Sequence, residues 1–146
     1  MAEIIEESLF PFIDGDIEES EVQEELPIPK EYAWDFERDC FVIENGKMKI
    51  VEGKEAIQIW AIKALRTARY RYLAYSWNYG SELEDLIGSS FSNKAIESEA
   101  TRYIEEALLV NPYITGIDNV EVSFTGDELS IKGRIMTIYG EVDINV

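Results

Sequence analysis

Histidine is absent from this chain of 146 residues, and Cys40 is its only cysteine. One cysteine cannot form an intrachain disulfide, and the usual nitrogen and sulfur ligands of zinc are missing. Basic residues are scarce, since 13 lysines and arginines face 30 acidic residues and leave a formal net charge of −17. Such a charge repels DNA phosphates and anionic lipid headgroups. We therefore expect no metal, no cofactor, and neither nucleic acid nor a membrane as partner.

Long apolar runs are also missing. No window approaches the roughly 18 apolar residues of a membrane span, and the N-terminus lacks the basic and apolar segments of a secretory signal. The sequence thus predicts a protein that is cytoplasmic when made. What is present is apolar material in short pieces, 46% of the residues, which predicts a folded domain with a modest core.

The first 30 residues differ in composition from the rest. They contain ten acidic residues, a single base at Lys30 and three of the four prolines. This predicts an acidic extended arm over residues 1–30 and a folded domain over residues 31–146. Residues 9–13, Leu-Phe-Pro-Phe-Ile, are too apolar for a solvated tail. Two interpretations stay open: the arm packs on its own domain, or it binds a partner and becomes ordered on assembly.

The hydrophobic periodicity predicts an α+β fold. Alternating apolar residues around Asn45-Gly46 predict an N-terminal β-hairpin over residues 31–51. Helical spacing predicts three helices, at residues 54–70, 81–88 and 92–110. The second of these would begin with a capping box formed by Ser81 and Glu84. Alternation after residue 120 predicts C-terminal antiparallel strands that form a small sheet, whose last strand, residues 142–146, lies at an edge open to another chain.

No constellation of residues predicts catalysis. Glu82, Glu84 and Asp85 cluster where a pair of carboxylates could hydrolyse a glycoside, but the start of a helix favours acids for stability alone. The basic residues Lys63, Arg66, Arg69 and Arg71, interleaved with tyrosines, could contact nucleic acid. In so acidic a chain, internal or interfacial ion pairs are the better interpretation.

The loop Ser76-Trp77-Asn78-Tyr79-Gly80 is unusually aromatic. Aromatic side chains in loops can anchor contacts between subunits, and tryptophan is common in cores. The sequence leaves both environments open for Trp77.

These residues resemble a known family. The segment 56–88 is similar to the baseplate wedge or sheath-initiator family of contractile phage tails. The most specific matches are Thr67 and Arg71 at the end of the first helix, the aromatic-glycine loop Trp77–Gly80 and the segment 83–88. The resemblance spans roughly residues 31–142 and is nearest to the version in prophages and phage-tail-like bacteriocins of Gram-positive bacteria. The family's acid-Pro-Arg triplet reads Asn111-Pro112-Tyr113 here, so only packing or a hydroxyl hydrogen bond of Tyr113 can replace its ion pair.

The resemblance implies a structural, non-enzymatic role. Several copies, six per particle, would sit in the baseplate around the tail tube, join a wedge protein and present a strand on which the tail sheath protein adds its own. Tail tube proteins would be further contacts. The residues expected at these interfaces are Arg71, Trp77, Asn78, Tyr79, Gly80, Tyr139, Val142 and Ile144. Two alternatives stay open: a baseplate-associated peptidoglycan hydrolase, and an adaptor whose acidic arm mimics nucleic acid.

Overall fold

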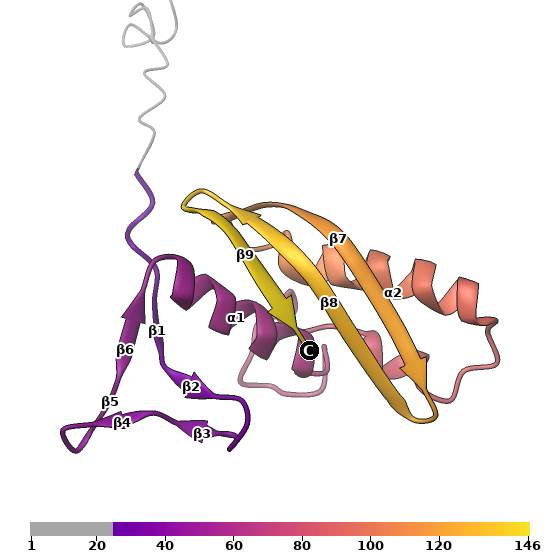
Figure 1. The fold of residues 1–146 in the computed structure, drawn as a ribbon, viewed down its shortest axis with the longest axis horizontal. Coiled ribbons are helices and arrows are strands. Elements are labelled where there is room, and N and C mark those ends of the chain that lie inside the picture. Colours follow the sequence, from indigo (N-terminus) through magenta and orange to yellow (C-terminus); the bar gives the residue numbers. More distant parts are fainter. Residues whose placement is uncertain (1–24) are drawn as a thin grey trace, which may run out of the picture.

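A computed structural model describes residues 25–146 of the chain. The apolar segment 9–13 and most of the predicted acidic arm therefore lie outside the described residues. A three-stranded sheet covers two α-helices, and a group of short strands lies beside the first helix (Figure 1). The broad α+β class fits, but the expected N-terminal hairpin and the expected three helices are both wrong.

Six short strands replace the expected hairpin. They form three separate antiparallel pairs, in which β1 pairs with β6, β2 with β3 and β4 with β5. Their bounds are β1 Lys30–Tyr32, β2 Trp34–Asp35, β3 Cys40–Phe41, β4 Ile43–Glu44, β5 Lys47–Met48 and β6 Ile50–Glu52.

An additional turn at residues 36–39 explains the difference. The Asp35 carboxylate accepts hydrogen bonds from the backbone N–H groups of Glu37 and Arg38, at 3.0 and 3.1 Å, and Asp39 has a φ of 52°. Asp favours such local turns because its short side chain bonds to backbone two residues further on. The alternation does change phase here, from Trp34 and Phe36 to Phe41 and Ile43, but this break was not used to predict a turn.

Helix α1 spans Lys54–Arg66 and is shorter than expected. It ends because Thr67 takes an extended conformation, with φ −93° and ψ 123°. The expected second helix is only one 3-10 turn, η1, at Leu83–Leu86. The predicted capping box is also wrong, since the buried Ser81 hydroxyl donates to the carbonyl of Leu65 at 2.8 Å instead.

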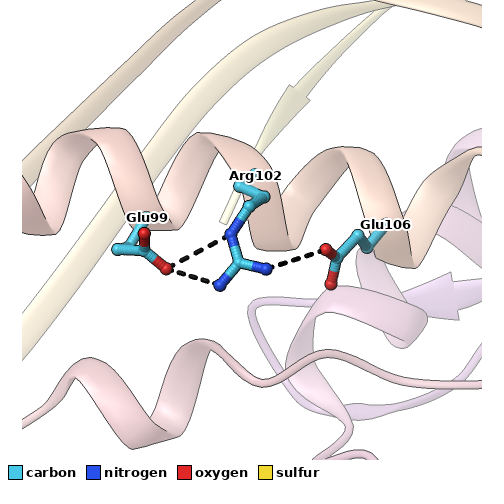
Figure 2. Close-up of polar contacts among 3 residues, drawn as sticks. All are labelled: Glu99, Arg102 and Glu106. Carbon is cyan, nitrogen blue, oxygen red and sulfur yellow. Dashed lines mark hydrogen bonds and ion pairs between the residues drawn. The ribbon is translucent and has the colours of Figure 1, made fainter.

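Helix α2 spans Asn93–Leu108, and the Ser92 side chain caps it by accepting from the N–H of Ala95 at 3.3 Å. On its exposed face, Arg102 lies between Glu99 and Glu106, with N···O distances of 2.6 and 3.0 Å (Figure 2). Ion pairs at this spacing each contribute a few tenths of a kcal/mol to helix stability. This face is thus stabilised locally, within the helix.

The C-terminal sheet has the order β7-β8-β9 and is antiparallel throughout. Its strands are β7 Ile114–Thr125, β8 Glu128–Thr137 and β9 Gly140–Asn145. One face is buried, because α2 packs against β7 and α1 against β9. The largest fully buried side chains of the core are Ile57, Leu86, Ile104, Leu108, Ile131 and Ile135.

A second, smaller cluster of buried residues joins the short strands to α1. It consists of Ala33 and Val51 on the strands and Ala56 and Ile59 on the helix. Helix α1 therefore packs on both units, with the sheet on one side and the short strands on the other. Over residues 25–146, none of the helices is long and apolar enough to cross a membrane, and no group of potential metal ligands is present.

Candidate assembly surfaces

The segment between α1 and η1 forms a loop whose two ends are fastened together. We call residues 67–81 the aromatic loop. Its ends form a parallel bridge, in which the N–H of Arg69 donates to the carbonyl of Ser81 and the N–H of Ser81 to that of Thr67, both at 2.9 Å. The Thr67 hydroxyl adds a bond to the carbonyl of Lys63 at 2.7 Å. The loop thus projects from a base that is fixed to the end of α1.

Gly80 is required at this base for two reasons. Its φ is 102°, which side chains rarely allow, and a Cβ atom would lie 2.8 Å from the carbonyl oxygen of Thr67 and 3.0 Å from the nitrogen of Arg69. Both of those atoms belong to backbone, which cannot rotate away. Glycine is therefore needed for the close approach of the two ends.

The aromatic loop carries a chain of ring contacts. Tyr79 packs on Trp60 of α1 with ring centroids 5.9 Å apart, and on Tyr75 at 4.6 Å. Tyr70 and Trp77 form a second pair at 5.3 Å. Together with Ala68, Tyr72, Leu73 and Ser76, these loop residues line a small hollow of about 90 Å³. The rings therefore continue outward from the core and end in solvent.

The exposed fractions separate the anchoring rings from the presented ones. Tyr79 is half-buried, and burial raises the pKa of its phenol above the ordinary value, so it is neutral at physiological pH. Trp77 is 74% exposed and Leu73 is fully exposed. Large apolar side chains with this exposure mark interaction sites in soluble proteins. The two environments that the sequence left open for Trp77 are thus resolved in favour of the surface.

Arg71 contacts the helical turn that follows the loop. Its guanidinium lies 2.7 Å from the carboxylate of Glu84, and the hydrogen bond and charge of Glu84 raise the pKa of Arg71. Both side chains are about half exposed, so the pair contributes little stability. It orients Arg71 toward the edge of the loop and engages one of the carboxylates that a hydrolase would have needed.

The other basic residues of this region contact groups of the same chain. Lys63 pairs with Glu31 at 3.1 Å and lies over the ring of Trp34. Arg66 lies over the ring of Phe36, with its guanidinium carbon 5.1 Å from the centroid. Arg69 lies 5.6 Å from the centroid of Tyr70. Lys63 and Arg71 thus have carboxylate partners within the chain, and Arg66 and Arg69 have aromatic partners. This supports the interpretation of internal pairing over that of a nucleic-acid surface.

The last strand, β9, forms one edge of the sheet. Ile131 of β8 and Val146 exchange two backbone hydrogen bonds of 2.7 and 2.8 Å, and such pairs alternate along an antiparallel ladder. The backbone groups of Glu141, Asp143 and Asn145 therefore point away from β8. One of them has a partner, because the side-chain amide of Gln58 donates to the carbonyl of Asp143 at 2.7 Å.

The residues expected at interfaces fall into two groups. Arg71, Trp77, Asn78, Tyr79 and Gly80 are brought together in the aromatic loop. Tyr139 lies in the turn between β8 and β9, with its ring stacked on Tyr113 at 6.4 Å. Val142 and Ile144 are 7% and 3% exposed, so only their strand's backbone edge is available to another chain. Tyr113 also donates its hydroxyl to the carbonyl of Pro27 at 2.5 Å, a hydrogen bond of the kind that the sequence left open.

Two participants were not found from the sequence. Gln58 caps the β9 edge across 85 positions of sequence, and no local pattern indicates such a contact. The approach of Gly80 to Thr67 was also missed. The sequence signal that could have predicted this close approach is a glycine directly after four polar and aromatic loop residues, Ser76 to Tyr79.

Replacement of Trp77 by alanine tests the role of the exposed ring. We expect Trp77→Ala to lower the free energy of unfolding by less than about 1 kcal/mol, because exposed side chains contribute little to the fold. The same variant should abolish assembly with the wedge protein that the resemblance implies as a partner, measured by co-purification. Unfolding of the free variant, measured by circular dichroism, would show that the ring belongs to the core.

Comparisons with known proteins agree with the resemblance seen in the sequence. Residues 30–140 match the family model described as contractile injection system sheath initiator. The chain is 32% identical, over 133 residues, to the phage-like element PBSX protein XkdS of Bacillus subtilis (strain 168). The aligned region covers 88% of this chain and 89% of that protein. These matches support a structural role in a contractile tail, with tail sheath and baseplate components as its contacts. The chain belongs to the family of contractile injection system sheath initiators.

Proposed function

We propose that this protein joins the wedge of a contractile tail baseplate and nucleates the sheath by strand addition. The observation that carries the proposal is the outer edge of β9, where alternate backbone groups at Glu141, Asp143 and Asn145 face away from the sheet. An extended segment of a sheath subunit can pair with such an edge through main-chain hydrogen bonds. The role is structural and needs no catalytic residue.

The aromatic loop is the proposed contact with the wedge protein. Trp77 and its neighbours supply exposed aromatic area, which carries much of the energy of protein interfaces. The fastened base of the loop keeps these side chains in place before a partner binds, so little entropy is lost on binding. Arg71 and Asn78 add polar groups at its rim.

In the particle, we place six copies around the tail tube, so that each presents one β9 edge to the first ring of sheath subunits. The protein is made in the cytoplasm and is then incorporated into the baseplate of a phage or a phage-tail-like particle. Its net charge of −17 keeps free copies apart before assembly.

Electron microscopy of particles from a strain that lacks the gene tests this function. We expect naked tail tubes or absent baseplates, with sheath that polymerises separately. A copy of the gene supplied in trans should restore sheathed tails. Normal contractile particles that merely fail to breach the cell wall would contradict the proposal and favour a peptidoglycan hydrolase.

A further inference from the structure

The short strands expose one strongly apolar face. Tyr32 and Ile50 are cross-strand neighbours, as are Ile43 and Met48, and the ring of Phe41 contacts that of Tyr32 with centroids 5.9 Å apart. We call these five residues the N-terminal apolar face. Their exposed fractions lie between 41% for Phe41 and 61% for Ile43. Contiguous apolar surface of this kind indicates a binding site.

The opposite side of the same strands is apolar as well. Ala33 and Val51, which alternate with Tyr32 and Ile50, are each 5% exposed and pack against α1. A strand unit that covers a domain from outside normally alternates apolar and polar residues. Here large apolar residues also stand on the outer side, next to the ion pair of Lys30 with Glu52, so that side offers apolar surface to a second layer.

The chain itself enters beside this face. Residues 27–29 are fixed on two sides, because the carbonyl of Pro27 accepts from the Tyr113 hydroxyl and that of Pro29 from the N–H of Gly53, at 2.5 and 2.9 Å. Leu26 and Ile28, close to this point of entry, are 42% and 59% exposed. Residues 9–13 precede Glu25 by 12 to 16 positions. An extended chain of 12 residues reaches about 40 Å, far enough to return to the face.

Acidic residues outnumber basic ones in both segments, eight to five over residues 25–55, but three lysines of that region are open to an acidic partner. Residues 1–24 contain nine acidic residues and no base. On the strand unit and at the start of α1, Lys47, Lys49 and Lys54 are exposed, and none of them lies within ion-pair distance of an acidic residue of 25–146. Lys47 and Lys49 alternate with Met48 and Ile50, so their side chains leave the strand on the side opposite the face.

We propose that the apolar segment of residues 9–13 docks in cis on the N-terminal apolar face. The site takes a short apolar peptide flanked by carboxylates, and its occupant is the protein's own N-terminal arm. This inference concerns the free protein and is independent of the proposed contacts with wedge and sheath.

Cross-linking tests the docking, because the only cysteine, Cys40, is exposed and directly precedes Phe41 of the face. Full-length protein with Ser8→Cys, next to Leu9, is treated with a short bismaleimide at low protein concentration. The matched control protein keeps Ser8→Cys but has Cys40→Ser and Ser98→Cys, so its second cysteine lies away from the face. We expect intramolecular cross-linking to be at least about tenfold faster in the test protein than in this control, because docking raises the effective concentration of the two thiols. Ser98 is exposed on α2.

Two variants decide whether the face is the cause. Ile43→Asp changes a side chain that is 61% exposed and so cannot unfold the core, and Phe12→Asp changes the arm. Each should slow the cross-link to the rate of the matched protein, whereas Phe91→Asp, at an apolar residue 58% exposed elsewhere, should leave it unchanged. Equal rates in all proteins would overturn the proposal. Cross-linked dimers in place of the intramolecular product would also overturn it, and would assign the face to a second copy.

Discussion

Strains that carry Asn145→Pro in this protein are expected to produce tail tubes with baseplates and without sheath. The N–H of Asn145 points away from β8, so proline removes a donor that the free fold does not use. A strand that adds at this edge would lose that hydrogen bond, which contributes about 1 kcal/mol, and would clash with the ring. With six copies in the proposed ring the losses add, and we expect the fraction of sheathed tails to fall by at least about tenfold.

Asn145→Ala is the matched control, because it removes the same side chain and keeps the N–H. Sheathed tails should form at the normal frequency with this variant. Both purified proteins should unfold within a few degrees of the original chain. Equal sheath formation by the proline and alanine variants would contradict strand addition at β9 and would require another surface for the sheath.

Gly80→Ala is expected to cause a larger loss of stability than alanine at the other positive-φ glycines of residues 25–146. A positive φ costs an alanine about 1–2 kcal/mol, and relief of the contact with the backbone of Thr67 and Arg69 costs a further 1–3 kcal/mol. We therefore expect a decrease of roughly 2–4 kcal/mol in the free energy of unfolding and a fall in Tm of about 10 °C. Thermal unfolding followed by circular dichroism measures this decrease.

Gly88→Ala separates the two causes. Gly88 also has a positive φ, of 76°, but a Cβ atom there would meet nothing within 4 Å. Its substitution should cost only the conformational part, about 1–2 kcal/mol. If both variants lose the same stability, the base of the aromatic loop can shift to accept the methyl group, and the close approach would not be what requires glycine at position 80.

The sequence predicted those parts of the fold that depend on local periodicity. Helix α2 was placed within two residues at each end, since Ser92 caps it and Asn111-Pro112 follows it. The errors arose where distant contacts override a local signal. Ser81 and Glu84 have the spacing of a capping box, but the parallel bridge to Ala68 draws Ser81 into the core, where its hydroxyl bonds to Leu65. Only one turn of helix can then form.

The same distinction holds for the candidate surfaces. The composition of the aromatic loop was enough to name Trp77 as a candidate, because several aromatic residues beside a glycine form a local pattern, but it left core and interface equally open. The edge position of β9 was also predicted, from its place at the end of an alternating series. The burial of Val142 and Ile144 depends on α1, which packs against this strand. The alternation within residues 140–146 indicates that these two side chains share a face, but not that α1 covers it.

The bond between Gln58 and Asp143 bears on the order in which such a particle forms. In the free protein a side chain of α1 already occupies the central acceptor of the β9 edge. A second copy that met this edge in the cytoplasm would have to displace the glutamine and would gain one hydrogen bond fewer than the geometry of the strand offers. A sheath subunit held in place by its neighbours brings further contacts and can compensate for this exchange. If the sheath adds at β9 as proposed, we expect this hydrogen bond of Gln58 to delay pairing at the edge until other components of the tail are in place.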